Sequence, residues 1–178
     1  MTFKPSDYFD LSEFPFKDIF DGTENIWEVL PKIHAYTSGK MIMGESCHVS
    51  DSAHIREGVI LGNNVTIGHA VELKNCIILN GAAVAHLSYI GDGIVGNQVN
   101  IAGGAMLANF RLDKQHVRVK AESGSIDTGL EKFSAVIGDD ASVGANSVIN
   151  PGTILGKRCL VYPLTSVTGV YNDGTTVR

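Results

Sequence analysis

The chain has 178 residues, 44% of them hydrophobic, and a formal net charge of −5 at pH 7. This length suits a single domain with a hydrophobic core. The negative charge argues against a nucleic-acid-binding protein, which normally carries an excess of basic residues. No hydrophobic run approaches the roughly 20 residues of a membrane span, and the opening MTFKPSDYFDLSEFPF has acids and prolines where a signal peptide is apolar. With three widely spaced cysteines, these features predict a cytoplasmic protein with reduced thiols and no membrane or nucleic-acid partner.

Residues 1–48 form an aromatic-rich segment that precedes the regular part of the sequence. In the stretch DGTENIWEVLPKIHAY, the aliphatic residues Ile26, Leu30 and Ile33 have helical spacing. Asp21 and Glu24 have the spacing of a capping box, and Pro31 is expected to kink or divide the helix. We expect this segment to be a helical cap over the open end of the repeat that follows, which would otherwise expose an unpaired edge.

From residue 49 onward, an aliphatic residue returns at every sixth position. The series are Val49, Ile55, Leu61, Ile67, Leu73 and Leu79, then Val95, Ile101 and Leu107, and then Ile137, Val143, Ile149, Leu155, Val161 and Val167. This period fits neither an α-helix nor an isolated strand. It fits an all-β solenoid whose coil has three short faces, each with one inward aliphatic residue. We therefore predict a left-handed parallel β-helix over residues 49–170 and a C-terminal tail at 171–178. A β-sandwich is the alternative, but its strands would not keep phase.

Three faces of six residues make an 18-residue coil, so residues 18 apart should stack. Arg56 and Lys74 are such a pair and predict a phosphate clamp. The alternative is a pair of surface bases neutralised by Glu57 and Glu72.

Apolar residues at outward positions of the coil need a cover. Ile60, Ile78 and Val148 are such residues. They predict a subunit interface, for which the prism shape favours a homotrimer. Scattered surface aliphatic residues are the alternative.

The stretch VAHLSYIGDGIVGNQVNIAGG breaks the period. Between Ala85 and Val95 the chain has ten residues where two units of the six-residue period would need twelve. Stacking places Gly68 and Ala102 beside His86, which would leave an open slot. A tightened coil would also push the side chains of His86 and Tyr89 towards a cleft. A lone histidine is more often structural, but its coincidence with the irregularity favours a functional role.

Residues 109–134 interrupt the repeat completely. An excursion of this length in a compact fold is usually a lid or a binding loop. Its segments HVRVKA and SIDT, on either side of a Ser-Gly turn, predict a small hairpin.

Residues 50–170 resemble a known family of enzymes. VELKNCIILNGAAVAHLSYIGDGIVGNQVNIAGGAMLANF is similar to the acetyltransferase domain of the bacterial bifunctional enzyme that makes UDP-N-acetylglucosamine. The continuation through NPGTILG resembles archaeal-type sugar-1-phosphate nucleotidylyltransferases with a similar β-helix. The HLSYIGD and VNI elements are the specific part of this resemblance, and the remainder is generic repeat.

The resemblance implies transfer of an acetyl group from acetyl-CoA, as co-substrate, to the amine of an amino-sugar 1-phosphate, without a metal. An imidazole suits this chemistry because it accepts protons near neutral pH. By the resemblance, His86 is the general base. The implied sugar and phosphate contacts are Arg56, Lys74, Tyr89, Asn100 and Asn109, and the implied CoA contacts are Gly103 and Ala145.

Departures from the family pattern leave two alternatives open. Phe110 replaces a tyrosine, and Tyr162 and Pro163 stand where the bacterial enzyme has small residues near acetyl-CoA. No Gly-rich nucleotide-binding motif is present, so we expect no pyrophosphorylase activity. A catalytically silent subunit that binds or regulates a separate nucleotidylyltransferase is the first alternative. The second is a carbonic anhydrase with a zinc ion held by three histidines, for which the sequence shows no short His–His spacing.

Overall fold

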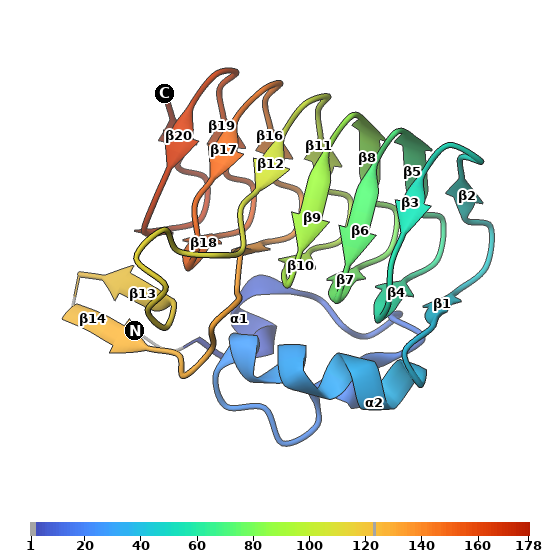
Figure 1. Cartoon of the computed structure of the whole chain (residues 1–178), viewed down its shortest axis with the longest axis horizontal. Helices are drawn as coiled ribbons and strands as arrows, with labels where there is room; N and C mark the ends of the chain where they lie inside the picture. Colours follow the sequence, from blue (N-terminus) through green and yellow to red (C-terminus); the bar gives the residue numbers. More distant parts are fainter. Residues whose placement is uncertain (1–2, 123) are drawn as a thin grey trace.

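The computed structural model describes residues 3–122 and 124–178 and shows a parallel β-solenoid with three faces (Figure 1). The predicted all-β class and parallel β-helix are therefore confirmed. No helix among the described residues has the length and apolar character needed to cross a membrane.

Each face of the solenoid is one parallel sheet. Sheet A contains β1 (Met41–Met43), β4 (Val59–Leu61), β7 (Cys76–Ile78), β10 (Ile94–Val95), β15 (Ala135–Ile137), β18 (Thr153–Leu155) and β21 (Val170–Tyr171). Sheet B contains β2 (His48–Val49), β5 (Thr66–His69), β8 (Ala83–His86), β11 (Asn100–Ile101), β16 (Ser142–Val143), β19 (Leu160–Val161) and β22 (Thr176–Val177). Sheet C contains β3 (His54–Ile55), β6 (Glu72–Lys74), β9 (Tyr89–Gly91), β12 (Met106–Leu107), β17 (Val148–Ile149) and β20 (Ser166–Val167). Strands β1 and β22 extend the solenoid beyond the expected limits at residues 49 and 170.

The coil length changes along the solenoid. His54 pairs with Glu72, 18 residues on, whereas Val59 pairs with Cys76 and Ile77 with Ile94, each 17 residues on. The shortfall of two residues expected between Ala85 and Val95 is therefore only half confirmed, because one residue is missing there and the other is missing between Glu72 and Cys76.

Two one-residue shortenings occur instead, both at the corner between sheets C and A. Asn75 and Asp92 form these tight corners with φ angles of 44° and 50°. Asn and Asp tolerate this left-handed conformation better than other residues with a side chain. As a result Ile78 points into the solenoid core, and Leu79 packs in a second cluster outside it.

The N-terminal segment covers the outer face of sheet A rather than the open end of the solenoid, as Figure 1 shows. It contains α1 (Pro5–Tyr8), two 3₁₀ helices (Lys17–Phe20 and Ile26–Lys32) and α2 (Ile33–Thr37). Its aromatic and aliphatic side chains form the second core with residues of sheet A such as Ile60, Ile77 and Ile94. The expected capping box is displaced, because Glu28 accepts a hydrogen bond from the backbone N–H of Asn25 (3.1 Å).

This cover corrects the expected interface. Ile60 is buried beneath the chain's own N-terminal segment, and Ile78 lies inside the solenoid. Of the three residues predicted for a subunit interface, Val148 on sheet C remains partly exposed, at 37%.

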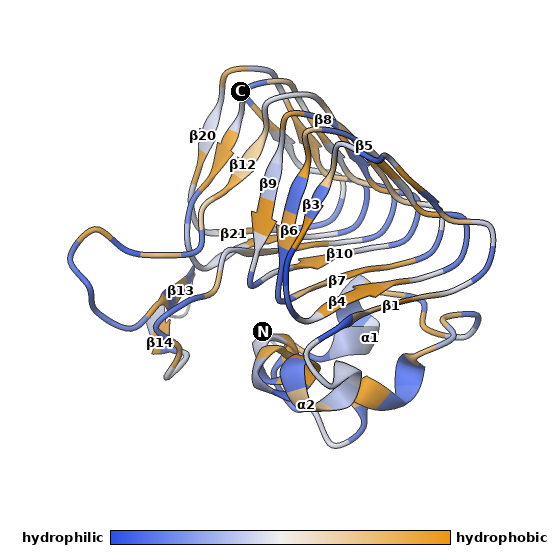
Figure 2. Ribbon diagram, turned by 45° about the vertical axis from the view of Figure 1, so that its right-hand side comes forward, coloured by the Kyte–Doolittle hydropathy of each residue, from blue (hydrophilic) through white to orange (hydrophobic). Residues whose placement is uncertain are grey.

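The excursion at 109–134 contains the predicted hairpin. β13 (Arg118–Ala121) and β14 (Gly124–Asp127) pair antiparallel, while Ser123 of the expected turn lies outside the described residues. Figure 2 shows the connection from β12 to β13 standing away from the solenoid, with Leu112 fully exposed. Val117, Val119 and Phe133 anchor the excursion in the second core.

Candidate functional site

A cleft of about 460 Å³ lies where sheet C ends and the 109–134 excursion begins. It is lined by Arg56, Lys74, Tyr89, Asn109, Phe110 and Lys132. Four of the predicted site residues, Arg56, Lys74, Tyr89 and Asn109, thus lie together. Phe110 and Lys132 close the cleft through a β-bridge between the start and the end of the excursion.

Asp92 joins several residues around this cleft through its carboxylate and its backbone oxygen. Its carboxylate, in a residue only 5% exposed, accepts hydrogen bonds from Asn75 Nδ2 (3.0 Å) and Asn109 Nδ2 (2.5 Å). It also lies 3.3 Å from Lys74 Nζ. The backbone oxygen of Asp92 accepts from the N–H of Ser134 (2.8 Å). One residue therefore holds both ends of the excursion against the solenoid. The sequence pattern did not indicate this role of Asp92, although the residue lies within the HLSYIGD motif.

The predicted cation clamp is changed by these pairings. Arg56 and Lys74 lie in adjacent coils, since the Arg56 N–H donates to Leu73 O (2.9 Å). Arg56 Nη1 is 3.1 Å from Glu72 Oε1, however, and Lys74 is paired with Asp92. Each cation of the expected clamp thus already has a carboxylate.

Lys132 is the cation of the cleft that sequence reasoning missed. It is exposed, and it takes part in none of the ion pairs found among residues 3–122 and 124–178. Lys132 lies at the end of the irregular excursion, where no six-residue repeat indicates which residues become neighbours. In the folded chain it is the lining cation available to bind an anion.

Tyr89 contributes a phenol to the cleft. Its oxygen accepts a hydrogen bond from Asn109 Nδ2 (3.0 Å). Burial, followed by the nearby carboxylates of Asp92 and Glu72, raises the pKa of Tyr89 above its ordinary value. The hydroxyl therefore keeps its proton at neutral pH and can donate it to a ligand.

His86 lies at a different corner, between sheets B and C, and is exposed. Its partner on the preceding coil is His69, not Gly68. On the following coil the N–H of Gly104 donates to His86 O (3.0 Å), which places Gly103, not Ala102, beside it. The expected slot between two small residues is therefore wrong on one side.

The corner row continues from His86 towards the C-terminus. Backbone hydrogen bonds from Asn146 to Gly103 O (3.0 Å) and from Leu164 to Ala145 O (2.9 Å) extend it. The row thus runs from His69 through His86, Gly103 and Ala145 to Pro163, and the two predicted CoA contacts lie in it.

His86 and the cleft are separated within one chain. The lining of the cleft does not include His86, which ends β8 of sheet B, whereas Lys74 and Tyr89 belong to β6 and β9 of sheet C. Tyr89 lies in the cleft as expected, whereas His86 is the last residue of β8, at the corner between sheets B and C. Asn100 is exposed on the outer face of sheet B, paired with Ala83 and Ser142. The structure therefore brings neither His86 nor Asn100 to the cleft.

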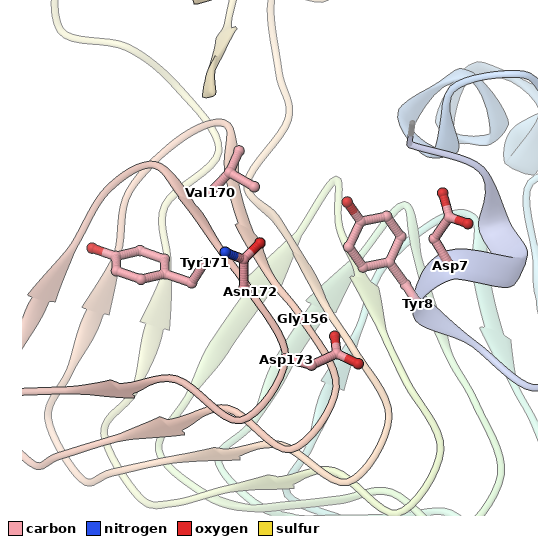
Figure 3. A pocket seen from close by; sticks show the side chains of 7 residues that line it. All are labelled: Asp7, Tyr8, Gly156, Val170, Tyr171, Asn172 and Asp173. Atoms are coloured by element: carbon pink, nitrogen blue, oxygen red, sulfur yellow. The ribbon is translucent and has the colours of Figure 1, made fainter. Parts of the chain in front are cut away.

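A further cleft of about 460 Å³ separates α1 from the last coil (Figure 3). Burial first, then the charges of Asp7 and Asp173, raises the pKa of Tyr8 on its wall. This cleft has no cationic side chain in its lining, which makes it unsuitable for a phosphate. Among residues 3–122 and 124–178, no three His, Cys, Asp or Glu side chains are grouped so as to hold a metal ion.

Comparison with known proteins finds two matching families. Residues 37–129 match the family described as GMPPB C-terminal domain. Residues 134–169 match bacterial transferase hexapeptide repeats, in a set of six repeats. Together these matches cover most of the solenoid.

Two curated relatives have similar sequences. A bifunctional sugar-1-phosphate nucleotidylyltransferase/acetyltransferase from Sulfurisphaera tokodaii is 36% identical over 94 residues, covering 53% of this chain and 23% of that protein. A putative uncharacterized acetyltransferase, YaiX, from Escherichia coli is 34% identical over 108 residues, covering 58% and 47%. The chain thus spans less than half the length of either relative.

Among solved structures, AntD, an N-acyltransferase from Bacillus cereus in complex with dTDP and coenzyme A, has a similar fold. It superposes with a TM-score of 0.58 at 19% identity, covering 82% of this chain and 80% of that one. This similarity supports the solenoid architecture alone.

Proposed function

We propose that this chain, which belongs to the GMPPB C-terminal domain family and carries hexapeptide transferase repeats, is an acyl-CoA-dependent N-acyltransferase acting on an amino-sugar 1-phosphate. Acetyl is the expected acyl group. One observation carries the proposal: a single stretch of chain places an exposed histidine, His86, beside Gly103 and then delivers Tyr89 to a polar cleft. The acetyltransferase names of the relatives support it.

The proposed reaction joins the amine nitrogen of the sugar to the acyl carbon of the thioester. The N–C bond forms, the C–S bond breaks, and the electron pair of the C–S bond leaves with the CoA sulfur. His86 accepts a proton from the attacking nitrogen and passes it to the leaving thiolate. We assign stabilisation of the developing oxyanion to backbone N–H groups near Gly103, and we assign Ala145, further along the row, to the CoA arm.

The cleft is assigned to the sugar phosphate. Lys132 supplies an unpaired cation, and Arg56 supplies a second at the rim that must share its charge with Glu72. Tyr89 and Asn109 offer a hydroxyl and an amide to sugar hydroxyls. Lys74 acts mainly by holding Asp92 in place. Asn100, on another sheet, belongs to the acceptor site only if a second subunit or an extended substrate reaches it.

A homotrimer fits the separation between His86 and the cleft. Sheet A is covered by the N-terminal segment, so contacts between subunits fall to sheets B and C. Both carry exposed apolar side chains, namely Met106 (42%) and Val148 (37%) on sheet C and Leu160 (45%) on sheet B. A triangular prism with two free faces favours closed threefold packing. Sedimentation equilibrium measures this directly.

The test follows release of free thiol from acetyl-CoA in the presence of glucosamine 1-phosphate. Wild-type protein should release thiol, and His86→Ala should lower the rate by about 100-fold or more, the usual effect of losing a general base. His48→Ala, which removes another exposed histidine from sheet B, is the matched control and should keep full activity. Absence of release by the wild type would contradict the proposal.

A silent subunit of a separate nucleotidylyltransferase is the second candidate, and one contact favours it. Tyr162 stands beside Pro163 at the end of the corner row, and the guanidinium of Arg178 stacks 4.8 Å from its ring centroid. These bulky side chains narrow the surface assigned to the CoA arm. A melting temperature that does not rise when acetyl-CoA is added would support the silent subunit, because a ligand of the folded state stabilises it.

A further inference from the structure

A second imidazole lies directly beside His86. His69 and His86 end neighbouring strands β5 and β8 and are register partners, so their Cα atoms lie about 4.8 Å apart, the usual spacing of paired strands. Both residues are exposed, and paired residues of parallel strands project to the same side of the sheet.

The ring of His69 is held by two serines. Its Nδ1 lies 2.6 Å from Ser52 Oγ, which lies 2.9 Å from Ser50 Oγ. The backbone N–H of Ser52 also donates to Ser50 Oγ (3.4 Å). In both side-chain contacts Ser52 Oγ can donate or accept. We assign it as the donor to Ser50 and the acceptor from Nδ1–H of His69. In this tautomer the Nε2 lone pair of His69 is free.

Strand register gives the titratable residues level with His69 on the two adjoining coils. Asp51 occupies the adjoining coil on one side, next to Ser52, and His86 occupies the coil on the other side. On its own stretch of chain, the nearest charged residue is Glu72, which lies on sheet C. His69 therefore sits between one carboxylate and the proposed base, open to solvent.

The stoichiometry of N-acylation requires two proton acceptors. An amino sugar arrives largely as an ammonium ion, and its nitrogen loses two protons on the way to the amide. One proton ends on the CoA thiol and the other leaves to solvent. A single imidazole holds one of these protons at a time.

We propose that His69 is the second proton acceptor of the site, an inference that rests on the proposed acyltransferase function. Nε2 of His69 removes the first proton from the ammonium group, which leaves a neutral amine and an imidazolium. The amine then attacks the thioester while His86 carries the second proton to the sulfur, and His69 returns its own proton to water. Atoms and charge balance without another reactant.

The test compares wild type with His69→Asn and His69→Gln as a function of pH, using acetyl-CoA and glucosamine 1-phosphate. Below the pH at which the amine loses its proton, kcat/KM of both variants should fall by about tenfold, less than for loss of the main base because water also accepts the first proton. Above that pH the acceptor arrives neutral, and the variants should approach the wild-type rate. Ser52→Ala should show the same pH-dependent defect in weaker form, and His48→Asn should show none.

Three results would overturn the inference. Variants as active as the wild type at every pH would remove any role for His69. A loss equal at every pH, in variants that melt like the wild type, would indicate a structural role alone. A wild type that transfers no acetyl group would overturn the proposed function together with this inference, whereas the first two results leave that function standing.

Discussion

Asp92 Oδ2 lies 3.3 Å from Nζ of Lys74 in the preceding coil, with side-chain exposures of 7% and 15%. This ion pair spans the corner at which the two coils are each one residue short. The short corners thus carry the polar centre of the cleft, and the irregularity of the repeat has a structural purpose. Because Lys74 is paired with Asp92, the proposed phosphate contact falls mainly to the other cations of the cleft.

Asp92→Asn should destabilise the fold and disorder the cleft. Removing one partner of a buried ion pair typically costs 3–5 kcal/mol, and we expect about 3 kcal/mol here because Lys74 retains some contact with water. Urea unfolding measures the loss. Glu72→Gln, which breaks the exposed pair with Arg56, is the control and should change the free energy of unfolding little. Equal effects of the two substitutions would contradict a central role for Asp92.

Lys132→Gln should weaken binding of the phosphate without harming the fold. The side chain is exposed and unpaired, so its main loss is a charge-assisted hydrogen bond to the ligand, worth about 1.5–3 kcal/mol. The expected result is a rise in KM for glucosamine 1-phosphate of about 10–100-fold at nearly constant kcat. Lys114→Gln, in the part of the excursion away from the cleft, should leave KM unchanged. A fall in kcat with unchanged KM would argue against this role.

Ile60→Ala should lower the stability of each chain rather than loosen an assembly. Ile60 is fully buried beneath the N-terminal segment, and truncating such a side chain costs about 3 kcal/mol. We expect this loss in denaturant unfolding at any protein concentration, with an unchanged sedimentation profile. Val148→Ala, on the exposed surface of sheet C, should cost much less. Dissociation of Ile60→Ala without loss of stability would show that sheet A is an interface after all.

Stability should fall on the alkaline side of pH 10, in part because of Tyr8. Burial and two carboxylates raise the pKa of this phenol in the folded state, so above pH about 10 the unfolded chain has lost a proton that the folded chain keeps. The free energy of unfolding then decreases as pH rises. The stability that the protonated Tyr8 contributes is complete below pH about 10. It is lost as the pH rises towards the higher pKa that Tyr8 has in the folded state.

Tyr8→Phe removes this titration. Between pH 9 and about pH 11, its free energy of unfolding should decline less steeply than that of the wild type. Chemical unfolding at a series of pH values gives both slopes. Tyr162→Phe, at a half-exposed tyrosine, provides the comparison. An unchanged slope in Tyr8→Phe would contradict the role assigned to burial.

Much of the architecture follows from the sequence, because inward positions on a narrow solenoid admit only small or aliphatic side chains. Leu61, Ile67 and Leu73 keep the six-residue period and all lie in the core. The stacking of Arg56 on Lys74 and the hairpin at β13 and β14 were predicted on similar local grounds. The phase is lost at Asn75, where one corner residue fewer turns Ile78 inward and Leu79 outward. A period does not record how many residues a corner uses.

The sequence alone determined the repeat, the length of a regular coil and the position of the excursion. Only the tertiary structure decided that the N-terminal segment covers sheet A, that Asp92 joins Lys74 to Asn109, and that His69 stands beside His86. The first set depends on local periodicity, which each six-residue unit carries within itself. The second set depends on which residues of separate coils become neighbours, and a slip of one residue at a corner changes every such pairing beyond it.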